Sequence, residues 1–450
     1  MEIHKILFSS LLIGVGSYSS QVMANNAQGW LFKDINNNPQ GINITGWIQG
    51  SIADSNHSEI LTPASVFRRT DGFALDQAGL MIQKNLDSNL ISRVGPIPKA
   101  APTEADWGFK ITGTYGADGL FFRTLGLDED WKANQKNDFN SNDAYANLTE
   151  AYVEFYLPNF QGSNLLLGLF HSPLANEIGF ALPSPAPAEF YTHTYGFFHG
   201  PAKHVGALWS SHLPMNNASL LGYELGIVRG YNNLEDPNND WSYIANLRWR
   251  SADMSTWIDF ENMYGNAADD SITNCGCGSP IPADSTLSND KSLNRYQSYL
   301  TLSKTLDDKN RLAIEASYGS QEKSVFADSF NQSSAFGVPE HQGVDAQWHG
   351  VTVNYFHKLT PQLTSSLRAE YFDTDGVHAF VPYSGIYKAV TTNLSWLPTP
   401  SIRIRPEVRY DWYSGHGKPF GIQANTNSPP LIDGSEKQQF TYSLDLTLFF

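Results

Sequence analysis

The residue types that usually carry catalysis are present in this chain, but they do not fall into catalytic spacings. There is no Gly-x-Ser-x-Gly segment to present a serine nucleophile, no His-Glu-x-x-His pair and no glycine-rich phosphate-binding loop. Ser and His also occur in outer-membrane hydrolases, but no spacing here singles out a catalytic site. The sequence therefore predicts neither an enzyme nor a bound cofactor.

A few histidines and cysteines raise the question of a metal site. His193, His199 and His204 follow one another at intervals that match no compact set of zinc ligands, which favours polar or pH-sensitive roles. Cys275 and Cys277 lie in a stretch rich in Gly, Ser and Pro. A disulfide across one residue is strained, although an oxidising compartment favours it, so free thiols and metal capture stay open as alternatives. We predict no metal site.

The clearest candidate chemistry is electrostatic. Residues 401–413 alternate between an apolar face and a charged face, and similar charged faces occur elsewhere. The basic members are Arg248, Arg250, Arg403, Arg405 and Arg409, and the acidic members are Glu150, Glu154, Glu370, Glu407 and Asp411. Arginine keeps its charge and presents a rigid fork of donors, so such faces can sort charged solutes along a wet path. Alternatively, the arginines pair with these acids and only brace a wall.

These charged faces belong to segments that alternate with a period of two, which predicts β-strands. Residues 437–450 are a second clear example, with apolar and polar side chains at every other position. Sixteen such segments are predicted: 41–53, 76–86, 106–116, 147–157, 163–170, 203–212, 219–231, 241–250, 254–265, 294–304, 309–319, 345–357, 361–373, 385–396, 401–413 and 437–450.

The connections between these strands alternate in length. Short ones such as 158–162 and 397–400 take turns with long polar ones such as 117–146 and 266–293. Residues 86–105 break the pattern, because they stand where a short turn is expected. Tight turns on one side and long loops on the other are typical of an outer-membrane barrel.

The physical reason for a closed barrel lies in the backbone. An unpaired N–H or C=O group costs several kcal/mol in hydrocarbon, so strands cross a membrane only without an open edge. Aromatic residues gather near strand ends, as an interfacial girdle requires, for example Tyr264, Trp396 and Tyr442. We therefore predict an all-β fold: a transmembrane antiparallel β-barrel of about sixteen strands with both termini periplasmic. A soluble β-sandwich or β-helix is the alternative.

Composition agrees with this interpretation. The chain of 450 residues has 41% hydrophobic, 13% aromatic and only 16% charged residues, with a formal net charge of −16. Outside the first 24 residues no apolar run approaches the roughly 18 to 20 residues that a spanning helix needs. The negative charge argues against nucleic-acid binding, which requires a basic face.

The N-terminus has the pattern of a secretory signal peptide. Lys5 precedes an apolar core, and Val22 and Ala24 provide small residues for cleavage after residue 24. An anchored N-terminal helix is the alternative, but the core is short for it. The predicted organisation is therefore a signal peptide at 1–24, a short periplasmic segment at 25–40 and an outer-membrane barrel at 41–450.

The chain also resembles the OmpL-like β-barrel porin family, of the beta-barrel porin-2 type. The resemblance rests on Glu177, Tyr191 and the segments 46–50, 151–154, 167–170, 197–201, 204–206 and 226–231. It implies a porin-like outer-membrane barrel without naming a solute. Relatives often have Asn where this chain has Arg229. The last strand with its terminal Phe450 resembles the C-terminal signature that the barrel-assembly machinery of Gram-negative bacteria reads.

The resemblance implies that the third long connection, residues 171–202, folds into the barrel and narrows it. This segment has five prolines and several aromatic residues, which a loop meant only for bulk water does not need. If it folds in, Glu177, Glu189, Tyr191 and His193 would face the wall arginines and form a charged constriction. A loop packed on its neighbours or on a trimer partner is the alternative.

We therefore predict a porin in the outer membrane of a Gram-negative bacterium. It would let small hydrophilic solutes or ions diffuse passively through a water-filled channel. Its expected partners are outer-membrane lipid, lipopolysaccharide and the assembly machinery, with a homotrimer as a further possibility. The alternative function is a plugged barrel that acts in binding, adhesion or structure through its long external loops.

Overall fold

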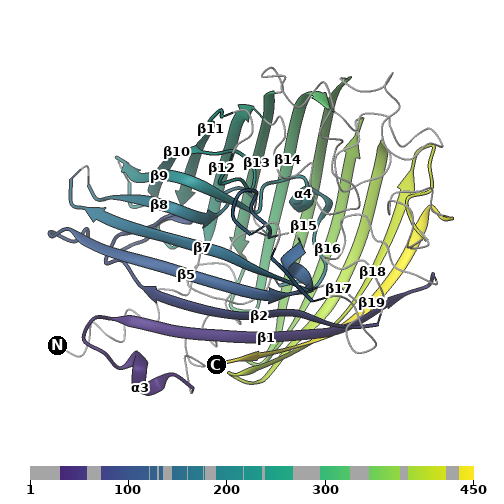
Figure 1. Ribbon diagram of the computed structural model, residues 1–450, viewed down its shortest axis with the longest axis horizontal. Coiled ribbons are helices and arrows are strands. Elements are labelled where there is room, and N and C mark those ends of the chain that lie inside the picture. The colour runs from purple at the N-terminus through teal and green to yellow at the C-terminus, as the bar shows by residue number, and fades with distance from the viewer. Residues whose placement is uncertain are drawn as a thin grey trace.

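The chain forms one closed antiparallel β-barrel (Figure 1). The computed structural model describes residues 31–57, 72–120, 122–128, 131–134, 144–159, 161–175, 177, 189–215, 217–235, 239–266, 294–324, 344–375, 384–421 and 435–450. The expected signal peptide at 1–24, and Cys275 and Cys277, lie outside these residues.

The main sheet contains seventeen strands, and one of them, β6 (Lys132–Asn134), only pairs with the end of β7. The other sixteen form the wall. They are β1(Ile42–Ser55), β2(Gly72–Lys84), β5(Asp106–Gly116), β7(Ala144–Leu157), β8(Ser163–His171), β9(Lys203–Leu213), β10(Leu220–Val228), β11(Ser242–Arg250), β12(Thr256–Asn266), β13(Asn294–Thr305), β14(Asn310–Ser324), β15(Val344–Thr360), β16(Leu363–Thr374), β17(Gly385–Thr399), β18(Ile402–Ser414) and β19(Gln438–Phe449).

Each wall strand pairs with its neighbours in sequence, and β1 closes the barrel by pairing with β19. The register of this closure runs from Trp47 opposite Phe449 to Ser55 opposite Thr441. All sixteen predicted strands are confirmed. The strands β14 and β15 extend further than expected, to Ser324 and Thr360, because the alternating pairing continues past the predicted ends.

The two faces of the wall differ as the period of two requires. On β19, Leu444 and Leu446 are each 50% exposed, whereas Asp445 and Thr447, which alternate with them, are buried. Neighbouring side chains of a strand point to opposite faces, so the apolar set points outward and the polar set points into the lumen. This is the pattern of a membrane barrel rather than of a soluble sandwich, whose inner face is apolar.

The described start of the chain and its C-terminus meet at the same end of the barrel. The short helix α3(Lys33–Asn36) precedes β1, and the rings of Phe32 and Phe450 lie 6.1 Å apart. The backbone of Phe450 exchanges two hydrogen bonds with Gly46, of 2.6 and 2.9 Å. Within the described residues, no helix has both the length and the apolar character to span a bilayer.

The remaining small elements lie in connections. They are η2(Ala117–Leu120), α4(Tyr195–Phe198) and the two-stranded β3(Leu90–Ile91) and β4(Gly95–Pro96). The element α4 is part of loop 3, which we define as residues 172–202 between β8 and β9. The pair β3–β4 belongs to residues 85–105, the connection that is too long for a turn. We call residues 85–105 the inner hairpin.

Candidate functional site

Loop 3 leaves β8 and first contacts the lumenal face of β11 and β12. Arg248 donates a hydrogen bond of 2.8 Å from Nη2 to the carbonyl of Pro173. The backbone N–H of Ala175 donates to Oε2 of Glu261 at 2.7 Å. Leu174 between them is fully buried. The first residues of loop 3 are therefore bound by charged wall side chains.

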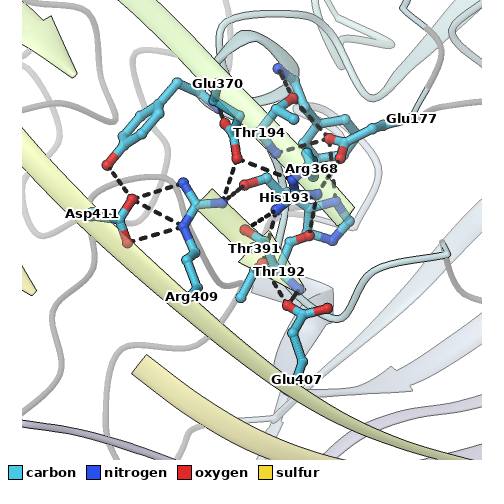
Figure 2. Close-up of polar contacts among 12 residues, drawn as sticks. Glu177, Thr192, His193, Thr194, Arg368, Glu370, Thr391, Glu407, Arg409 and Asp411 are labelled. Atoms are coloured by element: carbon cyan, nitrogen blue, oxygen red, sulfur yellow. Dashed lines mark hydrogen bonds and ion pairs between the residues drawn. The ribbon is translucent and has the colours of Figure 1, made fainter. Parts of the chain in front are cut away.

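Residues 190–199 of loop 3 lie against β15 to β18, on another part of the wall. The N–H groups of Tyr191 and Thr192 donate to the two carboxylate oxygens of Glu407, both at 2.8 Å, and the Thr192 hydroxyl donates at 2.6 Å (Figure 2). Glu407 is buried on the lumenal face of β18. One wall carboxylate thus satisfies three donors of the loop, and hydrogen bonds to a charged acceptor are strong.

Two wall arginines bind the carbonyl groups of the same residues. Arg368 donates at 2.8 Å to the carbonyl of Thr192 and pairs with Glu177 at 2.9 Å, while Arg409 donates at 3.1 Å to the carbonyl of His193. Figure 2 shows both guanidinium groups turned toward the loop. Backbone groups buried away from water need partners, and here the wall supplies them.

Two further wall acids, Glu370 and Asp411, bind the beginning of α4. The N–H of Tyr195 donates to Glu370 at 3.1 Å, and the Tyr195 hydroxyl donates to Asp411 at 2.8 Å. Arg409 pairs with both acids, at 2.6 and 2.8 Å. Thr194 caps α4 by accepting from the N–H of Phe197.

Aromatic rings bury the same part of the loop. The Tyr195 ring lies 5.1 Å from that of Tyr387, and the His199 ring lies 4.4 Å from that of Phe372. The guanidinium of Arg368 stacks over Phe190 at 4.5 Å. The aromatic residues that set this segment apart in the sequence therefore pack on wall aromatics, and each such pair adds stability beyond the area that it buries.

Tyr191 reaches the opposite side of this contact region. Its hydroxyl lies 2.8 Å from the Ser51 hydroxyl on β1 and donates at 3.4 Å to Asp76 on β2. Loop 3 therefore contacts wall strands on both sides of the β1–β19 seam.

The ionisation of two loop residues follows from these contacts. Burial alone would raise the pKa of Glu177, but His193, Arg368 and the N–H of Thr194 outweigh it and lower that pKa to about 2. Burial lowers the pKa of His193 despite the nearby Glu177. At neutral pH Glu177 is therefore charged and His193 neutral.

The two predicted loop acids pair with arginines that the sequence analysis did not single out. Glu177 pairs with Arg368, and Glu189 lies 3.7 Å from Arg311 on β14. Both arginines stand on the polar faces of predicted strands, and Arg368 is two residues from Glu370 on the same face. That shared face is the signal that could have found Arg368.

The five arginines named from the sequence all have acids of the wall as partners. Arg405 pairs with Asp445 at 2.6 Å, and Arg403 lies 3.9 Å from the same acid. Arg250 pairs with Asp259, and Arg248 pairs with Glu224 at 2.9 Å and Glu261 at 2.7 Å. These contacts favour the bracing role, and they leave the contribution of the arginines to selectivity open to test.

The remaining lumenal acids, Glu150 and Glu154, contact the inner hairpin and its surroundings. Glu150 binds Lys110 at 2.7 Å and Arg93 at 3.0 Å, and Glu154 accepts from Asn164 at 3.3 Å. Arg93 is not among the residues that the sequence singles out, because only the unusual length of residues 86–105 marks that segment.

The three histidines considered as metal ligands have separate polar partners. His204 bonds the carbonyl of Gly230 at 2.9 Å and the Ser172 hydroxyl at 3.0 Å, while His199 bonds the carbonyl of Tyr195 at 2.6 Å. Among the described residues, no group of three or more His, Cys, Asp or Glu side chains is arranged to hold a metal ion.

Closed sixteen-stranded antiparallel topology with a charged lumenal face defines a porin-like β-barrel. A sequence model of the family described as "Putative beta-barrel porin-2, OmpL-like" matches residues 41–450, and the chain belongs to this family. The family and the fold are those of channels and not of enzymes.

Solved structures share the fold at low sequence identity. The outer-membrane channel DcaP of Acinetobacter baumannii is 12% identical, with a TM-score of 0.51 over 91% of this chain and 97% of that chain. The anion-selective porin from Comamonas acidovorans is 9% identical, with a TM-score of 0.52 over 91% of this chain and 99% of that chain. A comparison with curated proteins finds none that matches this chain.

Proposed function

We propose that this protein is an outer-membrane porin: a water-filled channel through which small hydrophilic solutes or ions diffuse passively. The observation that carries the proposal is the lumenal face of the wall, which is charged along β11, β12, β16 and β18 while the outer face is apolar. A polar interior of this kind is typical of porin barrels, whose lumen is filled with water.

Loop 3 forms the constriction in this proposal. Glu407, Arg368 and Arg409 bind its backbone at Tyr191, Thr192 and His193, so these residues are held against the wall. The residues at the constriction are Glu177, Glu189, Tyr191 and His193 of the loop with Arg403, Arg405 and Arg409 of the wall. Arg248 contacts the first residues of the loop, whereas Arg250 contacts the carbonyl of Val94 in the inner hairpin. Such charge rings, together with pore width, set selectivity.

The charges around the tip of loop 3 nearly cancel. On the basic side stand Arg311, Arg368, Arg403, Arg405 and Arg409, and on the acidic side stand Glu177, Glu189, Glu370, Glu407, Asp411 and Asp445. The Comamonas porin of the same fold is described as anion-selective. For this chain, the near balance favours selection by size over strong selection by sign.

The second candidate function is a plugged barrel that binds a partner through its external loops. One observation favours it: many lumen-facing side chains are buried, among them Arg368, Arg405 and Asp445. A plugged barrel carries no current, whereas a porin does. The two functions are therefore separable by one electrical measurement.

Processing and assembly complete the proposal. Residues 1–24 are removed as a signal peptide, residues 25–40 and both termini of the mature chain are periplasmic, and the assembly machinery reads the last strand with Phe450. Pairing of Phe450 with Gly46 at the closing seam supports a special role for this end. The outer face contacts lipid and lipopolysaccharide, and a homotrimer is the assembly to test by crosslinking in native membranes.

The experiment is single-channel recording of the refolded or detergent-extracted full chain in planar bilayers. Heat-modifiable migration on denaturing gels first establishes that the barrel is folded. We expect discrete conductance steps and an anion-to-cation permeability ratio that shifts toward cations in Arg405→Glu. A folded protein that inserts without any conductance would support the plugged barrel instead. An unchanged ratio would remove Arg405 from selectivity.

A further inference from the structure

The inner hairpin, residues 85–105, is far longer than its place in the barrel requires. It joins neighbouring antiparallel strands, β2 and β5, with twenty-one residues. The other connections at this end of the barrel have between two residues (361–362) and six residues (214–219). A link between adjacent antiparallel strands needs only about two to five residues. The extra residues therefore serve something other than connection.

These extra residues contact the lumenal face of strands other than β2 and β5, which the hairpin connects. Arg93 Nη1 pairs with Glu150 of β7 at 3.0 Å, and Arg93 Nη2 donates to the Tyr152 hydroxyl at 3.2 Å. The backbone N–H of Arg93 donates to Glu224 of β10, and Arg250 of β11 donates to the carbonyl of Val94. The hairpin therefore enters the barrel from the end of the short turns and crosses toward β7 to β11.

Side-chain amides and hydroxyls hold its base. Asn164 of β8 accepts from the Ser88 hydroxyl at 2.7 Å and donates to the carbonyl of Leu90 at 3.2 Å. Residues 88–96 are buried apart from a half-buried Ile91, whereas 98 and 100–101 are exposed. A buried tip, followed by exposed residues that lead back to β5, indicates that the hairpin is inserted into the barrel and anchored there.

The tip is also fitted closely to the wall. Gly95 has a positive φ of 111°, and a Cβ atom at this position would stand 3.0 Å from Cβ of Arg248. Only glycine accepts both the backbone conformation and this approach without strain. Arg93 itself has a φ of 73°, which is uncommon for a residue with a side chain. Such conformations persist where surrounding contacts fix them.

The hairpin and the tip of loop 3 cover opposite parts of the wall. The hairpin contacts β7 to β11, centred on β9, whereas residues 190–199 contact strands from β13 across the β1–β19 seam to β2, centred on β17. In the closed sixteen-stranded order, seven strands lie between β9 and β17 in either direction. A path through the barrel must therefore pass two inserted segments that enter from opposite ends.

We propose that the inner hairpin is a second constriction of the channel, at the end opposite the mouth from which loop 3 enters, and that Arg93 is its anchor. This inference rests on the proposed channel function. Solutes then meet two narrow regions in series, and the hairpin sets the size limit together with loop 3.

The test replaces residues 89–97 by two glycines and compares single-channel conductance and liposome swelling with those of the wild type. When two similar resistances act in series, removal of one raises the conductance about twofold. We expect this rise, and faster entry of larger uncharged sugars. Heat-modifiable migration establishes that the variant is folded.

A matched pair of point variants keeps the test decisive if the deletion does not fold. Arg93→Met removes the buried anchor, whereas Lys99→Met removes the same charge from the exposed part of the hairpin, where it pairs with Asp87. We expect Arg93→Met to raise the conductance or its noise and Lys99→Met to leave both unchanged.

The outcomes separate this inference from the proposed function. If the wild type conducts and the folded deletion and Arg93→Met behave like it, the second constriction is wrong and the porin stands. If the wild type is silent and the deletion conducts, the hairpin blocks the barrel, which supports the inference in its strongest form and overturns the open porin. If wild type, deletion and Arg93→Met are all folded and silent, both proposals are wrong.

Discussion

Loop 3 and the inner hairpin both insert into the barrel, but they are held in different ways. The backbone of loop 3 is bound by wall charges, with Glu407 accepting its N–H groups and Arg368 and Arg409 donating to its carbonyls. The wall charges Glu224 and Arg250 likewise bind the backbone of the hairpin, but the hairpin adds a buried cation of its own, Arg93, which pairs with Glu150. Loop 3 adds large aromatic contacts, whereas the hairpin relies on small residues such as Gly95.

The difference shows that one barrel wall can anchor an inserted segment in two ways. Where the wall supplies the charges, several wall residues share the work, and a single loop residue can be changed at modest cost. Where the segment also supplies a buried charge, as the hairpin does with Arg93, part of its anchoring depends on that one side chain. Substitutions in the wall and in the inserted segments should therefore change the free energy of unfolding and the conductance by different amounts.

The largest effect is expected from Arg248→Met, because Arg248 contacts both inserted segments. It pairs with Glu224 and Glu261, donates to the carbonyl of Pro173 and lies against Gly95. Removing one partner of a buried ion pair costs about 3–5 kcal/mol, since the remaining acids stay buried without a partner. Urea unfolding in detergent micelles, followed by the gel shift, measures the loss. Arg229→Met, at a partly exposed position after β10 where the side chain contacts Asn239 and Trp241 and no acid, is the matched control and should change stability less.

A smaller effect is expected from Arg368→Met, which affects loop 3 alone. The variant loses the pairs with Glu177 and Glu370 and the hydrogen bonds to Thr192, while Glu370 keeps Arg409 as a partner, and Glu407 and Arg409 still hold the loop. We expect a loss of about 1–3 kcal/mol and a noisier, larger conductance. Wild-type conductance in this variant would mean that Arg368 does not position the constriction.

The pH dependence of the loop 3 anchor should be weak above pH 4. Because the pKa of Glu177 is lowered to about 2 from a usual 4.5, its ionised form stabilises the folded state fully above pH 4.5. This contribution is lost as the pH falls through about 2. Melting temperatures of wild type and Glu177→Gln should differ at pH 7 and converge near pH 2. A difference that vanished already between pH 6 and 5 would contradict the assignment.

The smallest effect is expected from Arg311→Met. Its distance of 3.7 Å to Glu189 is long, and both side chains are partly exposed, at 16% and 21%. Partly exposed pairs of this kind contribute about 0–1 kcal/mol. The variant should unfold like the wild type in the same urea titration. A loss as large as that of Arg368→Met would show that the second loop acid also anchors loop 3.

The sequence predicted the wall well because one rule governs every strand. A period of two assigns each side chain to lipid or lumen, so all sixteen strands and the lumenal acids Glu370, Glu407 and Asp411 follow from local alternation. The unusual composition of loop 3 likewise marked it as a special segment. These signals are local in the chain.

The partners across the lumen could not be predicted in the same way. Arg368 meets Glu177 over 191 positions of sequence, and Arg93 meets Glu224 over 131. Such pairs depend on the register of every strand between them and on how far each inserted segment reaches. In the sequence, the inner hairpin is marked only by its unusual length, since no residue pattern in 85–105 distinguishes a segment inserted into the barrel from one outside it.

The most direct test of the whole account is the swelling of liposomes that contain the folded full-length protein. An open porin should give rapid swelling in small uncharged sugars, slower swelling as the sugar grows, and none with large oligosaccharides. Protein that is heat-modifiable and inserted, yet permits no swelling with any of these solutes, would contradict the central claim that the barrel holds a continuous water-filled path.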